Sequence, residues 1–237
     1  MNIFDQPAYL KPSDPDGDVT IFGKAPGQNE IDTRNGIARL GGFWRQPDYA
    51  RAYLKSAGVL LQHGQATGTL DDIALPAFYL QRHALELLVK GLLQQVYEIG
   101  EFRENKQIPS EGQKKRLIKS HAVKQLIEDL KTSCQALDLP NPPEELHDVA
   151  LTQATYESTD TWARYATSES TKAGTVTLNK HMEQEVELPI LSLQEKLQAA
   201  FTQTKHVSVS DDTYDIQLHA HWEAAARAAG IYDDDNS

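Results

Sequence analysis

The sequence predicts a mainly α-helical protein, a bundle with one small β-hairpin late in the chain. Apolar residues recur at three- and four-residue spacing over most of the chain after residue 47. Residues that begin or end helices flank these runs. Alternating apolar and polar residues, the pattern of strands, occur only near 175–190. The chain has 237 residues, 40% hydrophobic and 24% charged, which suits one large globular domain or two small ones.

The beginning of the chain differs in composition from the rest. Residues 1–46 are rich in Pro, Gly, Asp and Asn, which predicts an irregular N-terminal arm. VTIF at 19–22 is a candidate short strand, and Phe43 and Trp44 are natural anchors for the arm on the domain or on a partner chain. We therefore expect an arm over 1–46 and a helical domain over 47–237.

The first two helices of this domain have clear start signals. Asp48 is a candidate N-cap for the first, and Gly64 is expected to end it. Asp71 or Asp72 is a candidate cap for the second, which would carry Pro76 in its first turns.

The middle of the chain predicts a loop and two more helices. Residues 100–115 are polar and contain Gly and Pro, so we expect a loop. Ser120 would cap a third helix, and Pro143 suits the first turn of a fourth.

The last third predicts the hairpin and two C-terminal helices. TVTL at 175–178 and VELPI at 186–190 are expected to pair as its strands. C-terminal helices are expected over 192–230, with Ser192 as a cap and Gly230 at the end.

Charge and cysteine content limit the classes of function. The formal net charge of −11 disfavours broad, non-specific binding to DNA or other nucleic acid, because phosphate backbones are repelled. Cys134 is the only cysteine, so no intrachain disulfide forms, and we expect a reducing compartment and an inert thiol. No leader-like segment and no apolar run of membrane-spanning length occur. We therefore expect a cytoplasmic protein without membrane contact.

One predicted helix carries polar residues along a single strip. With Arg82 at 0°, Glu86 lies at about 40°, Tyr79 at about 60°, Lys90 at about 80° and His83 at about 100° around the helix. We call these five residues the polar arc. The arc is interpreted as a solvated set of i,i+4 pairs, an internal polar network or the lining of a cleft.

The same helix carries a family resemblance. FYLQRHALELLVKGLL resembles the signature helix of the HEPN superfamily, helical proteins of prokaryotic toxin and defence systems. YARAYLKSAGVLL before it, and SHAVKQLIEDL and TWARYA after it, resemble further family elements in the same order. The resemblance covers about 48–166 and implies a HEPN-like bundle. It also implies that Arg164 and Tyr165, from TWARYA, close over the polar arc, whereas on general grounds this stretch equally suits an aromatic anchor at the end of a helix.

Many HEPN proteins are metal-independent ribonucleases with an Arg-x4–6-His motif at a dimer interface. Arg116 and His121 match this motif. The resemblance therefore implies a homodimer, an RNA or nucleotide ligand and no cofactor, with His121 as acid–base catalyst and Arg116 stabilising the transition state. On residue type alone, packing of His121 near a helix start and a loop position for Arg116 rank slightly ahead of this catalytic interpretation.

The remaining histidine pair gives no metal site. His219 and His221 point about 200° apart on a helix, so we expect no bound metal. Three hypotheses follow: a HEPN ribonuclease using Arg116 and His121, a non-catalytic module that binds a nucleotide or partner chain through the polar arc, and an oligomerisation protein with the arc as an internal network. On sequence alone, the two non-catalytic hypotheses together rank slightly above the ribonuclease.

Overall fold

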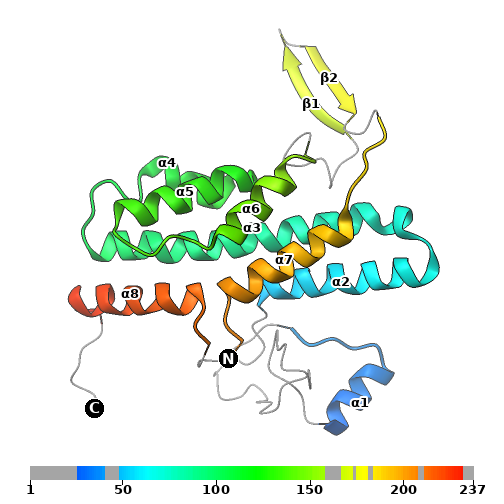
Figure 1. Cartoon of the computed structure of the whole chain (residues 1–237), viewed down its shortest axis with the longest axis horizontal. Coiled ribbons are helices and arrows are strands. Elements are labelled where there is room, and N and C mark those ends of the chain that lie inside the picture. Colours follow the sequence, from blue (N-terminus) through cyan, green and yellow to red (C-terminus); the bar gives the residue numbers. More distant parts are fainter. Residues whose placement is uncertain are drawn as a thin grey trace. The chain divides into compact units, whose positions relative to one another are not determined.

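The computed structural model describes residues 26–40, 48–157, 167–172, 175–180, 184–207 and 211–231. Within these residues the protein is mainly helical, with eight helices and two short strands (Figure 1). The chain divides into two compact units, residues 1–52 and 53–237. The predicted class, a mainly α protein, is confirmed.

The N-terminal unit contains a helix where the sequence suggested irregular chain. Helix α1 spans Pro26–Arg34, and beyond it Arg39 donates two hydrogen bonds, of 2.7 and 2.9 Å, to the Asp32 carboxylate. The sequence did not predict α1 because Pro and Gly are frequent around it. The helix itself begins with Pro26, at the favoured first position, and contains no Pro or Gly after Gly27. The candidate strand at 19–22 and the anchors Phe43 and Trp44 lie outside the described residues.

Helix α2 spans Tyr49–Thr67 and begins as predicted, because the Asp48 carboxylate accepts the Arg51 amide at 3.1 Å. It does not end at Gly64. A Cβ at Gly64 would lie 2.5 Å from the Ile73 side chain, so this glycine permits close packing.

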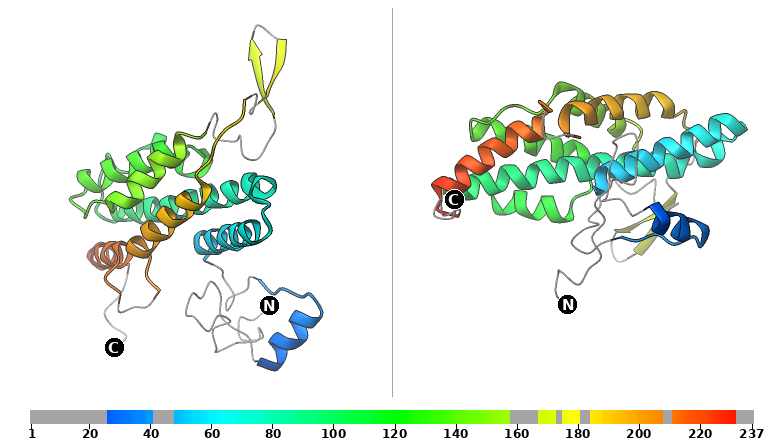
Figure 2. Two further views of the ribbon diagram at one scale, coloured as in Figure 1. Left: turned by 45° about the vertical axis from the view of Figure 1, so that its right-hand side comes forward. Right: turned by 90° about the horizontal axis from the view of Figure 1, so that it is seen from below.

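Helix α3, Leu70–Phe102, is the longest element and the centre of the bundle. Helix α2 runs beside its N-terminal half and α8, Tyr214–Ala228, beside its C-terminal half (Figures 1 and 2). Because neighbours surround it on most sides, α3 buries both apolar residues and part of the polar arc.

The expected loop at 100–115 is partly helical. Helix α4 spans Glu111–Lys119 and starts with a capping box, in which Ser110 and Gln113 each bond the other's backbone amide. Ser120 ends α4 and does not cap the next helix, because α5 spans Val123–Ala136 and follows Ala122.

Helix α6, Glu144–Ala154, follows Pro143 as expected. Strands β1, Thr167–Lys172, and β2, Thr175–Lys180, pair antiparallel with Thr167 opposite Lys180. The expected pairing of 175–178 with 186–190 is therefore wrong.

Pro189 explains this difference, since it donates no hydrogen bond to a ladder and instead precedes α7, Ile190–Thr204. Helix α7 thus starts before the expected cap Ser192. Helix α8 ends just before Gly230, whose φ of +70° suits glycine, as predicted.

A buried apolar cluster joins α2, α3 and α7, made of Leu61, Ala77, Phe78, Ile190 and Leu193. Buried amides reinforce it, since Gln194 donates to the Leu54 carbonyl at 3.1 Å and Gln81 donates to Gln194 at 3.0 Å. Among the described helices, none has the length and apolar character needed to cross a bilayer.

Candidate functional site

The polar arc of α3 divides into two groups. His83 stacks on Tyr79 with ring centroids 5.7 Å apart and meets Tyr53 of α2 edge-on at 4.6 Å. Arg82 and Glu86, by contrast, are each only 2% exposed. The aromatic group is thus a packing contact between α2 and α3, and the charged group is an internal network.

Arg82 contacts three different parts of the chain. Its Nη1 donates to Glu86 Oε2 at 3.2 Å, and its Nε donates to Glu157 Oε1, just beyond α6, at 2.8 Å. Its Nη2 donates to the backbone carbonyl of His121. One buried guanidinium therefore ties α3 to the end of α6 and to the link between α4 and α5.

Glu86 also bonds to Lys90 and His121. Its Oε1 lies 2.9 Å from Lys90 Nζ and 2.9 Å from His121 Nδ1. Burial tends to raise the pKa of Glu86, but the hydrogen bonds from Lys90 and His121 prevail and hold it below its usual value. Glu86 is therefore a buried carboxylate that stays ionised because its partners compensate its charge.

His121 is held from two directions. Arg82 holds its backbone carbonyl and Glu86 holds its ring. Because an ionised carboxylate only accepts hydrogen bonds, Nδ1 carries a proton and Nε2 of the neutral ring is an acceptor. The side chain is 36% exposed, and Nε2 has no hydrogen-bond partner in the described part of the chain. The site thus presents an oriented imidazole nitrogen to solvent.

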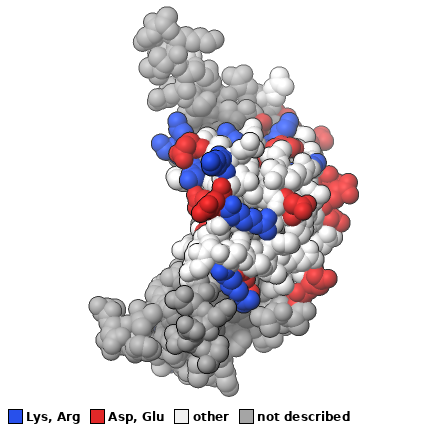
Figure 3. All heavy atoms as spheres, turned by 90° about the vertical axis from the view of Figure 1, so that its left-hand side faces the viewer, with Lys and Arg blue, Asp and Glu red and all other residues white. Residues whose placement is uncertain are grey.

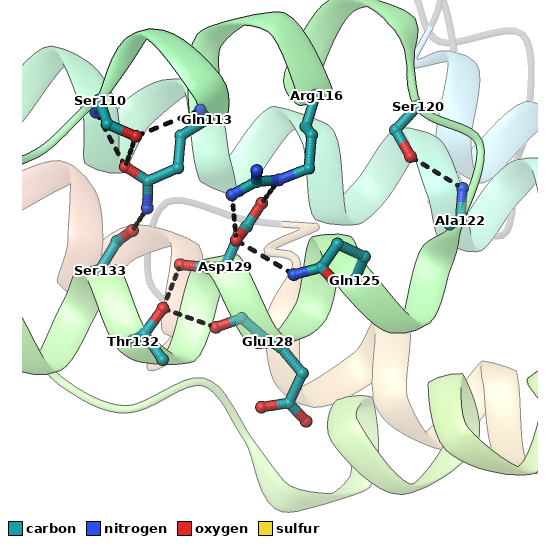
Figure 4. Close-up of polar contacts among 10 residues, drawn as sticks. All are labelled: Ser110, Gln113, Arg116, Ser120, Ala122, Gln125, Glu128, Asp129, Thr132 and Ser133. Carbon is teal, nitrogen blue, oxygen red and sulfur yellow. Dashed lines mark hydrogen bonds and ion pairs between the residues drawn. The ribbon is translucent and has the colours of Figure 1, made fainter.

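Arg116 lies on α4, in a helix and not in a loop. Its Nε and Nη2 donate to the Asp129 carboxylate of α5 at 2.7 and 2.9 Å (Figure 4). Asp129 is 5% exposed and also accepts Gln125 at 3.4 Å. The third nitrogen, Nη1, makes no hydrogen bond among the described residues. Arg116 therefore joins α4 to α5 with two of its nitrogens.

Two further contacts fix the link that carries His121. Gln113 donates to the Ser133 hydroxyl at 3.1 Å, and the Ala122 amide donates to Ser120 Oγ at 3.1 Å (Figure 4). The first contact ties the start of α4 to the C-terminal part of α5, and the second lets Ser120 close the turn around His121.

The surface charge near this link is locally basic within an acidic chain. Lys115, Lys119 and Lys124 are exposed and have no ion pair within the described ranges, whereas Lys114 pairs with Glu101 at 2.8 Å. On the face drawn in Figure 3, charges of both signs are interspersed, with broad uncharged areas between them. The described residues on this face therefore form no continuous basic track for a nucleic-acid backbone.

The other residues considered from the sequence lie away from this network or outside the described residues. Cys134 is buried, its sulfur lies 3.2 Å from the Tyr214 hydroxyl, and burial raises the pKa of the thiol. His219 stacks on Trp222 at 5.5 Å, and the described residues hold no group of three or more metal-ligating side chains. Arg164 and Tyr165 lie outside the described residues, so their place over the arc stays a prediction.

Sequence reasoning missed one residue of the network, Glu157, and one contact, between His121 and Glu86. Glu157 follows α6 without any pattern that marks it, and its link to Arg82 spans 75 positions. The contact between His121 and Glu86 spans 35 positions. Helical periodicity identifies residues on one face, but it does not identify their partners on other helices.

Comparison with protein-family models, with curated proteins and with solved structures finds no match to this chain.

Proposed function

We propose that this HEPN-like chain cleaves RNA without a metal and that His121 is its acid–base group. The observation that carries the proposal is the anchoring of the His121 ring by buried Glu86, with Nε2 left open to solvent. A carboxylate on Nδ1 fixes the tautomer of the imidazole and stabilises the imidazolium that forms when Nε2 takes a proton. These are the properties required of a general base.

The reaction is a transfer within the RNA strand. His121 Nε2 removes the proton from a ribose 2′-hydroxyl, and the 2′-oxygen attacks the adjacent phosphorus. The bond to the 5′-oxygen breaks, and that oxygen leaves with a proton from an imidazolium. The products are a 2′,3′-cyclic phosphate and a 5′-hydroxyl. Arg116 retains Nη1 for a phosphate oxygen, and exposed Lys119 and Lys124 favour the approach of an anion.

The burial of Arg82 and Glu86 in the polar arc favours His121, and not the arc itself, as the functional centre. Arg82 and Glu86 are buried, and their charges are satisfied by Lys90, Glu157 and each other. A ligand in the arc would have to break these contacts in a poorly solvated environment. The sequence ranked the two non-catalytic hypotheses together slightly ahead of the ribonuclease, and the burial of Arg82 and Glu86 is the reason for preferring His121 here.

One observation favours a second candidate, a non-catalytic module of a prokaryotic defence or toxin-type system. Arg116, which the resemblance assigns to the transition state, has two of its nitrogens on Asp129. In this alternative the network serves to unite α3, α5 and α6, and the chain acts by binding a partner chain or a nucleotide on its surface.

An RNA cleavage assay tests the proposal. An end-labelled RNA pool is incubated in EDTA with the wild type, His121→Ala and a control, His63→Ala, which removes an exposed histidine of α2. Loss of His121 is expected to reduce the rate by about 10²–10⁴-fold. The control is expected to cut like the wild type and to give cyclic phosphate ends.

No cutting by folded wild type, or equal cutting by His121→Ala, would contradict the proposal. The first result leaves the binding module. The second places the catalytic group elsewhere.

A further inference from the structure

We infer that Arg82 is a positioning residue for His121 and that Glu157 fixes the orientation of Arg82. The inference rests on the proposed acid–base role of His121 and adds to it the residues that set the geometry of the ring. It also connects the chain beyond α6 to the site.

The contacts of Arg82 meet at His121. One nitrogen donates to the His121 carbonyl and another to Glu86, whose other oxygen contacts the His121 ring. Arg82 therefore acts on the backbone and the side chain of the same histidine. The planar guanidinium holds its nitrogens in a fixed fork, so a shift at one contact moves the others.

Glu157 accepts from the third nitrogen of this fork. The Nε–Oε1 distance is 2.8 Å, and the Glu157 side chain is 10% exposed. Without this acceptor, the guanidinium is expected to rotate toward a new partner, and both contacts to the His121 region would loosen. Because a small displacement of a catalytic group lowers a rate strongly, Glu157 should affect catalysis through Arg82.

The test compares variants of Glu157 with a matched control in the full-length chain. Glu157→Ala removes the acceptor, and Glu157→Gln keeps a neutral one. Glu128→Gln is the control, because Glu128 also pairs across helices, with His147 at 3.1 Å, but belongs to a separate ion pair. Arg82→Lys tests whether a single charge can replace the fork.

Two readouts separate positioning from general stability. Long-range nitrogen NMR reports the tautomer of the His121 ring without any substrate, and steady-state cleavage under multiple-turnover conditions reports kcat and KM. We expect Glu157→Ala to convert a single Nδ1–H tautomer into a mixture. The same variant should lower kcat by about tenfold to a hundredfold with little change in KM. Glu157→Gln should lie between it and the wild type, and Glu128→Gln should match the wild type.

Folded Glu157→Ala and Arg82→Lys with wild-type tautomer populations would overturn the inference, as would equal effects in Glu128→Gln. If the wild type fails to cleave RNA, the proposed function fails. The tautomer measurement still decides whether Arg82 and Glu157 position the ring. The two failures are therefore distinguishable.

Discussion

Glu86 is the residue on which the site depends most. It is buried, it is charged, and its oxygens receive Arg82, Lys90 and His121. A carboxylate in this position costs free energy unless each partner is present. The network is consequently sensitive to pH and to single substitutions.

Acid should weaken the protein through Glu86. Its pKa in the folded state lies below the ordinary value of 4.5, so its contribution is fully present above that value and is lost as the pH falls through the lowered pKa. Lys90→Met removes one cause of the lowering, so the folded-state pKa of Glu86 should rise toward its ordinary value, and the acid-induced loss of stability should be smaller and complete at a higher pH. The variant should also be less stable at pH 7 by about 1.5 kcal/mol.

Urea unfolding between pH 7 and pH 3 measures this effect. Glu86→Gln, which has no carboxyl group at this position, is the reference without the titration. Parallel pH profiles for Lys90→Met and the wild type would contradict the prediction.

Gln153 of α6 is a second residue with an unusual environment. It is 1% exposed, and neither its amide nitrogen nor its amide oxygen has a hydrogen-bond partner among the described residues. Gln153→Met should therefore raise the free energy of unfolding by about 1–2 kcal/mol, because a buried unsatisfied amide is replaced by an apolar chain of similar shape.

Gln194→Met is the matched control, since Gln194 is also buried but bonds to Leu54 and Gln81. It should lose stability. Urea unfolding of both variants decides the matter, and a destabilised Gln153→Met would show that the amide has partners in solution.

At the scale of single residues, the sequence predicted which side chains share the polar strip but not what each one contacts. Arg82, Glu86 and Lys90 form the i,i+4 pairs that their spacing predicts. Their burial and their link to His121 depend on α4, α5 and the end of α6, which fold over α3 from distant positions.

At the scale of elements, two glycines of α3 have opposite surroundings. A Cβ at Gly100 would lie 2.3 Å from the Ile108 carbonyl oxygen, whereas nothing lies within 4 Å of one at Gly91. Gly100→Ala should lower the free energy of unfolding by at least about 2 kcal/mol, because the new methyl group would force α3 away from the Ile108 backbone. Gly91→Ala should raise the free energy of unfolding by about 0.5–1 kcal/mol, because alanine has the higher helix propensity.

Thermal and urea unfolding of the two variants check this contrast. Equal effects of the two substitutions would mean that the segment after α3 does not approach Gly100 in solution.

Element boundaries were predictable where a cap or a long apolar period was present. Helix starts follow Asp48 and Pro143, and Gly230 follows the end of α8, as predicted. Helix α4 was missed because it is short and polar, and its only signal was the capping box at Ser110 and Gln113. The strand pairing was wrong because 186–190 has a strand-like composition but leads into α7.

For the whole molecule, the resemblance to HEPN proteins implies that the Arg116–His121 motif lies at an interface between two copies of the chain. Ile118 lies three residues before His121 and is 75% exposed. Ile118→Lys should therefore weaken self-association at least about tenfold, because a buried apolar contact is replaced by a charge.

Sedimentation equilibrium measures the dissociation constant of self-association. Val59→Lys is the control, because Val59 is also an exposed apolar residue, 59% exposed, but lies on α2. A monomeric wild type, or equal weakening by both variants, would contradict a dimer through this face.

The central claim is that Glu86 and His121 act as one unit, and a double-mutant cycle tests it most directly. Single-turnover RNA cleavage is measured in EDTA for the wild type, Glu86→Gln, His121→Ala and the double variant, each shown to be folded. Glu86→Gln is expected to cleave more slowly than the wild type, and the double variant is expected to cleave no more slowly than His121→Ala alone. Fully additive losses, or a Glu86→Gln variant as fast as the wild type, would contradict it.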